Sequence, residues 1–332
     1  MLNPIPKVDF LVDPYTQGMI IHLPTRLTVR EAVSFKQTFH KILQSNLLMK
    51  EIVLDWQETQ FIDSSGIGAL ISNLKLANTH GVKLILRHVN PPVMSVLLMT
   101  GLNKILDIES EDSSDSISND HTEKHHLPHT HPSVKSRLKR LIDIIGALVG
   151  LIITAILFVP IAIAIKIESP GPVLFSQIRC GWLGKKFRLW KFRSMCVNAE
   201  VMKATIINQV QGPLFKNDND PRITKVGKFL RRTSLDELPQ FWNVLLGEMS
   251  LVGTRPPTED EVERYEVPEW QRLDVKPGIT GEWQIYGRSK IRNFEDVIRL
   301  DLRYQHNWSL FYDLKLISKT IIVLFSKNSG AV

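Results

Sequence analysis

Two periodicities of apolar residues alternate along the first 108 residues. Runs of strand type occur at four places: DFLVD at 9–13, MIIHL at 19–23, EIVLD at 51–55 and VKLIL at 82–86. Helical patterns lie between them and start near Gly66, near Val93 and at Thr28, where Glu31 completes a capping-box pattern. Strands interleaved with helices predict a small α/β domain over residues 1–108.

The apolar pattern stops at residue 109. Residues 109–136 read ESEDSSDSISNDHTEKHHLPHTHPSVKS and contain almost no large apolar side chain. Such a segment cannot bury enough apolar surface to offset the entropy lost on ordering, so we predict a disordered linker rich in His, Ser and Asp. Its histidines suit a metal by composition, but a solvated tract is the favoured interpretation. They are His121, His125, His126, His129 and His131.

A long apolar run follows the linker. Residues 144–165 are 22 uncharged residues, which would form a helix about 33 Å long. A hydrocarbon core is about 30 Å thick, so the run predicts contact with a membrane. The alternative is a buried helix of a soluble domain, which the length and purity of the run disfavour.

The charges that flank this run favour a re-entrant path. Lysine and arginine lie on both sides of it, and positive charge collects on the cytoplasmic side of a membrane. Pro160 inside the run removes a helix hydrogen bond and allows a bend. We therefore predict a re-entrant helix at about residues 141–167 that bends near Pro160 and returns to the same face, in preference to a span.

The composition of the chain predicts an anionic partner. The chain of 332 residues has a formal net charge of +7, which suits nucleic acid, a phosphorylated substrate or anionic lipid. Its two cysteines, Cys180 and Cys196, have no metal-type spacing, so a reducing compartment without a disulfide framework fits. The N-terminus has no basic segment followed by an apolar one, so we expect no signal peptide and a cytoplasmic first domain.

Two adjacent acids, Asp236 and Glu237, admit two interpretations. The structural one is that Ser234 to Glu237 forms a capping box at the start of a helix, where acids also complement the helix dipole. The catalytic one is that one acid holds Mg²⁺ against a pyrophosphate while the other attacks phosphorus. Basic residues suited to phosphate occur nearby in the sequence and farther on: Lys191, Arg193, Arg231, Arg232, Arg255 and Arg288.

Five ordered blocks carry a family resemblance. They are KRLIDIIGALVG at 139–150, SPGPVLFSQ at 169–177, KFRSM at 191–195, TSLDELPQFWNVLLGEMSLVGTRP at 233–256 and KPGITGEWQIYGRS at 276–289. Residues 137–332 resemble the bacterial sugar transferase family, the monotopic polyprenyl-phosphate phosphoglycosyl transferases. The resemblance implies a membrane-associated, mostly α domain with a re-entrant helix and a small β element. Two positions depart from the family pattern: Val159 replaces a serine before Pro160, and Thr254 replaces the proline of GPRP.

The same resemblance implies a two-step transfer. Asp236 would attack the sugar-bearing phosphate of a nucleoside-diphosphate sugar, a UDP-sugar by family habit, and release UMP. Polyprenyl phosphate, such as undecaprenyl phosphate, would then take the phosphosugar, as the first membrane step of exopolysaccharide or O-antigen-type glycan synthesis. Glu237 would bind Mg²⁺ as the cofactor. The substrate-binding residues would be Lys191, Arg193, Arg231, Arg255 and Arg288.

The first domain resembles a different family. FIDSSGIGALISNLKLANTHGVKLIL at 61–86 is similar to a STAS domain, the fold of anti-sigma factor antagonists. In regulatory members the serine after that aspartate is phosphorylated, which makes Ser64 the phosphorylation candidate. A phosphate there would lie near the N-terminus of a helix. Plain N-capping of that helix is the alternative, and it is slightly favoured because a STAS module also serves as a docking or dimerisation surface.

These inferences place the protein at the bacterial cytoplasmic membrane, with both domains on the cytoplasmic face. Expected partners are a UDP-sugar, polyprenyl phosphate, membrane lipids, a regulatory protein or kinase at the STAS-like domain, and a second copy of the chain; nucleic acid is not expected. The alternative function is a catalytically idle scaffold or regulator acting through the STAS-like domain. The intact set Asp236, Glu237 and Arg255 disfavours it, and one apolar run is too few for a STAS-bearing anion transporter.

Overall fold

The chain forms two compact units. The computed structural model describes residues 8–15, 18–45, 49–109, 131–210, 212–215, 217–286 and 293–325. The first unit comprises residues 1–130 together with 183–185 and 265–274, and the second comprises the remaining residues from 131 onward. Of the predicted segments, residues 110–130 of the linker and Arg288 lie outside the described residues.

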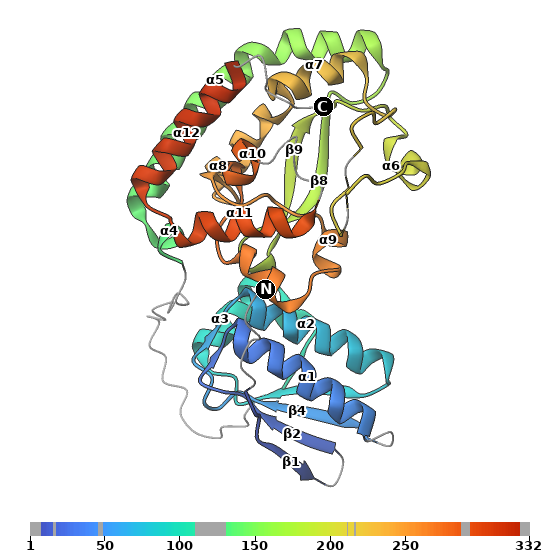
Figure 1. The fold of residues 1–332 in the computed structure, drawn as a ribbon, viewed down its shortest axis with the longest axis vertical. Helices are drawn as coiled ribbons and strands as arrows, with labels where there is room; N and C mark the ends of the chain where they lie inside the picture. Colours follow the sequence, from blue (N-terminus) through green and yellow to red (C-terminus); the bar gives the residue numbers. More distant parts are fainter. Residues whose placement is uncertain are drawn as a thin grey trace, which may run out of the picture. The chain divides into compact units, whose positions relative to one another are not determined.

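The first unit is built on a five-stranded sheet. Its strands are ordered β1 (Val12–Tyr15), β2 (Gly18–His22), β4 (Glu51–Asp55), β6 (Lys83–Arg87) and β7 (Asp107–Ile108), and only β1 runs antiparallel to its neighbour. Figure 1 shows α1 (Val29–Ser45) and α2 (Ser64–Thr79) side by side on one face of this sheet. The predicted α/β fold of this part of the chain is confirmed.

Sequence periodicity located the central strands but missed a smaller pair. β3 (Arg26–Leu27) and β5 (Phe61–Ile62) pair in parallel, with two residues each. A strand of two residues is too short to show an alternating pattern. The predicted helix near Val93 divides into α3 (Pro91–Thr100) and the 3₁₀ helix η1 (Leu102–Lys104), separated by Gly101 in the left-handed conformation.

One segment of the first unit comes from far along the chain. The 3₁₀ helix η5 (Val267–Leu273) belongs to this unit and packs mainly on α2 and also on α1. Local sequence patterns did not predict this, because they carry no information about which helices a distant segment contacts.

The predicted disorder does not extend to the end of the linker. Residues 132–135 form a short helix, α4 (Pro132–Lys135), whose N-cap is His131. The ring of His131 accepts a hydrogen bond from the backbone N–H of Ser133 and donates one from Nε2 to the carbonyl of Gln305, 3.0 Å away. The prediction was wrong here because this tertiary partner is not visible in the composition of the segment.

The apolar run forms a single helix. α5 (Arg137–Glu168) is continuous through Pro160, and Figure 1 shows that its path bends between two limbs. The helix is long and apolar enough to cross a membrane, and only 22% of its most apolar stretch is buried within the protein. Many of its large apolar side chains are exposed. The re-entrant path and the bend at Pro160 in a membrane stay predictions.

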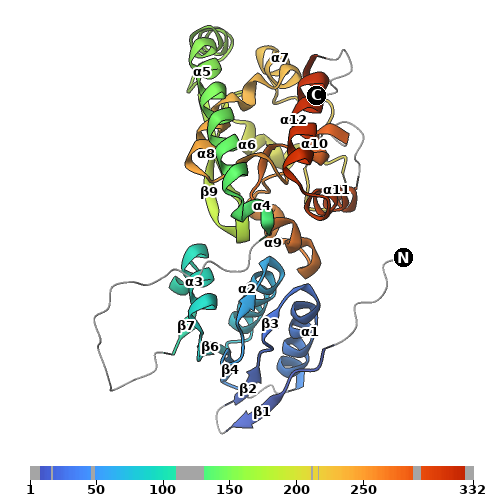
Figure 2. The same ribbon diagram turned by 90° about the vertical axis from the view of Figure 1, so that its left-hand side faces the viewer.

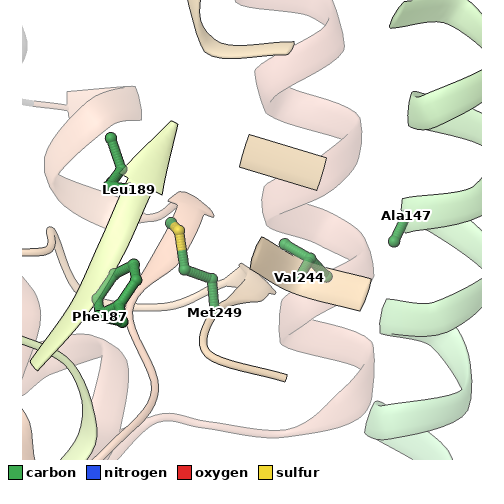
Figure 3. Packing of buried hydrophobic residues seen from close by; sticks show 5 residues of the cluster. All are labelled: Ala147, Phe187, Leu189, Val244 and Met249. Carbon is green, nitrogen blue, oxygen red and sulfur yellow. The ribbon is translucent and has the colours of Figure 1, made fainter. Parts of the chain in front are cut away.

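The second unit packs α5 against a β-hairpin through one shared core. β8 (Leu174–Cys180) and β9 (Lys186–Phe192) form the antiparallel hairpin, and α8 (Phe241–Leu246) lies between it and α5. Figure 2 shows α5 running beside α8. In Figure 3, Val244 of α8 faces Ala147 of α5, while Met249 extends toward Phe187 and Leu189 of β9. This core holds β9 in place, and β9 contributes to the site described below.

The remaining elements of the second unit complete its mostly α architecture. A parallel pair, β10 (Ser250–Val252) and β11 (Gly278–Thr280), is the second small β element. The helices before it are α6 (Ala199–Met202), η3 (Lys203–Thr205), α7 (Lys225–Thr233) and η4 (Leu235–Gln240). The helices after β10 are α9 (Glu259–Glu263), α10 (Glu282–Tyr286), α11 (Phe294–His306) and α12 (Leu310–Phe325).

A buried ion pair joins α5 to α12 in the second unit. Lys139 of α5 donates to Asp313 of α12 at 2.6 Å, and both side chains are more than nine-tenths buried. The hydroxyl oxygen of Tyr304 of α11 lies 2.9 Å from a carboxylate oxygen of Asp313 and 3.0 Å from the backbone carbonyl oxygen of Val252, two acceptors for its one proton. The network satisfies its charges internally, as burial requires. It connects α5, α11, α12 and β10.

Candidate active site

One cavity of the second unit collects the predicted site residues. It has a volume of about 840 Å³ and lies beside the β8–β9 hairpin, η4 and the segment that follows β10. Six of the seven predicted catalytic and substrate-binding residues line it: Lys191, Arg193, Arg231, Asp236, Glu237 and Arg255. The seventh, Arg288, lies outside the described residues.

The two acids lie in the first turn of η4, but the predicted capping box does not form. Ser234 ends α7 in the left-handed conformation, with φ 57°, and its side chain makes no cap hydrogen bond to η4. That backbone conformation turns the chain sharply between the two helices, which the local pattern did not show. Asp236 is 5% exposed and faces the cavity, so the acids are available for chemistry at its wall.

Glu237 is held by an ion pair across the cavity wall. Lys191 of β9 donates from Nζ to Oε1 of Glu237 at 2.9 Å, and both side chains are partly exposed to the cavity. β9 and η4 pack against each other, so the pair is formed between two supported elements. The ion pair fixes the position of the Glu237 carboxylate at the cavity wall.

Arg231 provides a half-buried positive charge near Asp236. It lies in the last turn of α7, and its Nε donates to the hydroxyl of Ser194 at 2.9 Å. Burial lowers the pKa of Arg231, while the nearby carboxylate of Asp236 opposes that change. Opposite charges in a partly desolvated site attract strongly, so Arg231 and Asp236 attract each other at the cavity wall.

Arg255 is oriented by a carboxylate of its own. Its two terminal nitrogens donate to the two oxygens of Glu261, at 2.6 and 3.1 Å. The guanidinium carbon also lies 5.7 Å from the centre of the Trp283 ring. A bidentate pair and an aromatic face restrict the planar group to one orientation at the cavity wall.

Arg193 has a different set of partners from those expected of a substrate-binding residue. Its terminal nitrogens donate to the backbone carbonyls of Ser169, at 2.6 Å, and Pro170, at 2.9 Å. Gly171, with φ 116°, leaves room for the guanidinium, since a Cβ there would meet Arg193. The residue therefore stabilises the turn that follows α5. Its contact with a substrate stays a prediction.

Sequence reasoning missed several basic residues of the cavity. Arg179 of β8 donates to the carbonyl of Pro256 and to the side chain of Gln177, at 2.9 and 2.8 Å. Burial, with the positive charge of Arg255 nearby, lowers the pKa of Arg179 to about 10. The signal was the alternation along the strand, because Gln177 and Arg179 lie two residues apart on one face. The other basic residues missed are Lys203, Arg222 and Arg264.

The charges of the cavity suit a diphosphate. Its lining includes eight lysine or arginine residues and five aspartate or glutamate residues, so positive charge is in excess. Arginine in particular binds phosphate oxygens through paired donors. Two adjacent carboxylates and an excess of lysine and arginine in one cavity are the kinds of group that phosphoryl transfer requires.

The two acids also fit a magnesium ion. Mg²⁺ in phosphate-transfer sites is commonly bound by one or two carboxylates, with the remaining ligands from the substrate and water. Asp236 and Glu237 offer carboxylate oxygens at one wall of a cavity that is rich in phosphate-binding groups. Among the described residues no group of three or more His, Cys, Asp and Glu side chains suits a metal, so the ion would rely on substrate oxygens.

Ser64 lies in the first unit and does not line the cavity. It is the first residue of α2 and is fully buried. Asp63 is the N-cap, and its side chain accepts from the backbone N–H of Gly66 at 2.9 Å. The hydroxyl of Ser64 donates to Asp274 at 2.5 Å. N-capping is thus carried out by Asp63, and phosphorylation of Ser64 stays a prediction.

Two family models together cover most of the chain. Residues 134–327 match the model described as bacterial sugar transferase, and residues 10–115 match the STAS domain model. The second match agrees with the α/β fold of the first unit, which is STAS-like. The first match covers the helices, the hairpin and the cavity of the second unit, together with the segment 265–274.

Three curated relatives match the second part of the chain. The galactosyl transferase CpsE of Streptococcus agalactiae is 51% identical over 188 residues, which cover 56% of this chain and 42% of that protein. The UDP-glucose:undecaprenyl-phosphate glucose-1-phosphate transferase of Escherichia coli is 44% identical over 204 residues, which cover 59% and 42%. The exopolysaccharide production protein ExoY of Rhizobium meliloti is 41% identical over 198 residues, which cover 58% and 87%. The matched region is thus less than half of the first two proteins and most of ExoY.

Proposed function

Since the chain belongs to the bacterial sugar transferase family, we propose that it transfers a phosphosugar from a nucleoside-diphosphate sugar to polyprenyl phosphate. The donor is a UDP-sugar and the acceptor is undecaprenyl phosphate, in keeping with the name of the Escherichia coli relative. The product is the lipid-linked first sugar of an exopolysaccharide or O-antigen-type glycan. The single observation that carries the proposal is the cavity that brings Asp236 and Glu237 together with Lys191, Arg231 and Arg255.

The transfer proceeds in two displacements at one phosphorus atom. A carboxylate oxygen of Asp236 attacks the phosphorus that bears the sugar, the P–O bond to the nucleotide breaks, and UMP leaves. An oxygen of polyprenyl phosphate then attacks the same phosphorus and releases the carboxylate of Asp236. The product is a polyprenyl-diphosphate sugar. Both steps exchange one P–O bond for another, so neither needs an oxidant or a reductant.

The basic residues position the donor and offset its charge. Arg231 attracts the carboxylate of Asp236 at the cavity wall, and the fixed guanidinium of Arg255 binds phosphate oxygens. Lys191 orients Glu237. Glu237, with Asp236 alongside, would hold Mg²⁺, which would supply positive charge to the diphosphate oxygens. Preorganised charges of this kind contribute most where charge develops in the transition state.

A membrane-bound acceptor requires a membrane-bound enzyme. α5 is long and apolar enough to enter a bilayer, and its exposed isoleucines and leucines would otherwise face water. We place the protein at the bacterial cytoplasmic membrane, with both domains on the cytoplasmic face and the helix in a re-entrant path. Nucleotide sugars are made in the cytoplasm, so this side of the membrane provides the donor.

The test is nucleotide release by purified protein in detergent with Mg²⁺, undecaprenyl phosphate and a panel of UDP-sugars that includes UDP-glucose and UDP-galactose. One UDP-sugar should yield UMP and a lipid-linked sugar, and Asp236→Asn should abolish both. Glu237→Gln should lower turnover and raise the Mg²⁺ concentration needed. The matched control is Asp296→Asn on the exposed surface of α11, which should turn over normally.

The alternative proposal, a catalytically idle scaffold acting through the STAS-like domain, predicts a different result. It requires that no UDP-sugar is consumed although the protein binds membranes. Turnover that is unchanged in Asp236→Asn would reject the aspartyl intermediate while leaving the transferase activity in place.

A further inference from the structure

The segment Tyr265–Asp274 is packed as part of the first unit. It joins α9 to β11 in the sequence and lies within the region matched to the sugar transferase family, yet it packs with α1 and α2 of the STAS-like fold. A connecting segment needs no buried side chains, and this one has several. Trp270 is 6% exposed, Leu273 is 2% exposed and Arg272 is fully buried.

The indole ring of Trp270 packs directly against Gly68 of α2, which has no side chain. A Cβ added to Gly68 would come within 2.5 Å of the indole ring, and the three atoms nearest to it all belong to Trp270. Glycine is a poor choice for the interior of a helix, where alanine is favoured by roughly 1 kcal/mol. The close approach of Trp270 therefore explains the glycine at position 68, because a Cβ there would collide with the indole ring.

Asp274, at the C-terminal end of the segment, binds Ser64. One oxygen of Asp274, Oδ1, accepts from the backbone N–H of Ser64 at 3.0 Å and from its hydroxyl at 2.5 Å. Ser64 is fully buried in this arrangement. At the solvent edge of the contact, Lys36 of α1 donates to Glu266 at 3.0 Å. Trp270 and Asp274 are the anchors, since the exposed Lys36–Glu266 pair adds little.

The position around Ser64 already holds two carboxyl groups. Burial raises the pKa of Asp274, and burial together with the charge of Asp274 raises the pKa of Asp63. Negative charge is therefore disfavoured here even before any is added. A further negative group on Ser64 would face Asp274 at hydrogen-bond distance and would lose the hydrogen bond that its hydroxyl donates.

We propose that Tyr265–Asp274 is an intramolecular ligand of the α1–α2 face of the STAS-like domain, and that docking of this segment and a negative charge on Ser64 exclude each other. An enzyme that modifies Ser64, or a protein that binds this end of α2, then meets Ser64 only after the segment has been released. The occupant of the surface is this chain's own segment. The proposal does not depend on the transferase activity.

Hydrogen exchange of the full chain in detergent, followed by mass spectrometry, tests the proposal. In the wild-type protein the amides of 265–274 and of the first turn of α2 should be protected. Ser64→Asp should accelerate exchange in 265–274 by at least tenfold while β4 stays protected. Asn78→Asp, at an exposed position near the other end of α2, is the matched control and should leave 265–274 protected.

A second variant tests the proposal if Ser64→Asp unfolds the whole STAS-like domain. Gly68→Ala improves the intrinsic helix propensity of α2 but displaces Trp270, so it should expose 265–274 with β4 unaffected. Asn78→Ala, near the other end of α2, is its control. Exposure of 265–274 in Gly68→Ala with an intact β4 supports the docked segment. Wild-type protection of 265–274 in both Ser64→Asp and Gly68→Ala overturns the proposal.

Discussion

The ion pair between Lys191 and Glu237 decides how one of the two acids of the cavity is presented. The lysine donates at 2.9 Å from a strand that the hydrophobic core holds in place. Lys191→Met should leave Glu237 without its oriented cation and lower kcat/KM for UMP release by about 10²-fold, a magnitude typical of losing one preorganised charged donor.

The controls for this variant separate charge from packing. Lys191→Arg keeps a positive donor and should retain part of the activity. Lys83→Met, at an exposed position of β6 in the first unit, should have wild-type kinetics. Full activity of Lys191→Met would remove this lysine from the proposed site.

The stability of the first unit should depend on pH through Asp63. Burial raises the pKa of Asp63 to about 7, and the charge of Asp274 adds to this effect. The folded form then holds a proton that the unfolded form has lost between about pH 4 and pH 7, so the free energy of unfolding falls as pH rises through this range. Above about pH 7 the whole cost is present, and below about pH 4 it is absent.

Asp63→Asn isolates this effect, since asparagine is also a good N-cap but does not titrate. Thermal unfolding of the first unit in the full chain should show a smaller drop in midpoint between pH 5 and pH 7.5 in the variant than in the wild type. The pH dependence would be assigned to other groups if the two proteins lost the same number of degrees.

At the scale of elements, one buried pair joins α5 to α12. Lys139 and Asp313 are 2.6 Å apart, and Asp313 also accepts from Tyr304 and Trp308. Removing one partner of a buried pair leaves an uncompensated charge, so Lys139→Met should destabilise the second unit by about 3–5 kcal/mol. Lys139→Met combined with Asp313→Leu should recover part of this loss, because no buried charge then remains.

Chemical unfolding in detergent measures both changes. Lys166→Met, at the exposed end of α5, controls for the loss of a lysine from the same helix. Equal stability of Lys139→Met and Lys166→Met would show that the pair adds nothing to the stability of the second unit.

At the scale of the whole molecule, the exposed apolar surface of α5 should determine where the protein resides. Ile152 is 62% exposed and Ile156 is 70% exposed. Burying each such side chain in lipid contributes about 1.5–3 kcal/mol. Ile152→Ser combined with Ile156→Ser should therefore lower partitioning into phosphatidylethanolamine–phosphatidylglycerol vesicles by at least about tenfold.

Flotation with vesicles checks this expectation. Leu98→Ser combined with Ile105→Ser removes two comparably exposed apolar side chains from the first unit and should leave partitioning unchanged. Equal loss in both double variants would mean that general surface hydrophobicity, not α5, brings the protein to the membrane.

The sequence alone determined the elements whose signals are local. β4 carries Ile52, Val53 and Leu54 in a continuous buried run, and these residues by themselves predict a strand. The uncharged stretch within α5 likewise predicts a long apolar helix from its own residues. The resemblance carried by five ordered blocks also brought Asp236, Glu237 and their cations to attention, because a family pattern records residues that function together wherever they lie in the chain.

Tertiary structure decided the partners of each group. Ser234 takes the left-handed conformation at the junction of α7 and η4, so the capping box that its neighbours suggested does not form. Arg193 turns to the carbonyls after α5, and Arg179 reaches the cavity from β8. Trp270 and Asp274 pack onto residues about 200 positions earlier. Periodicity reports which side of an element is apolar, whereas contacts between distant residues arise from the way the chain closes on itself.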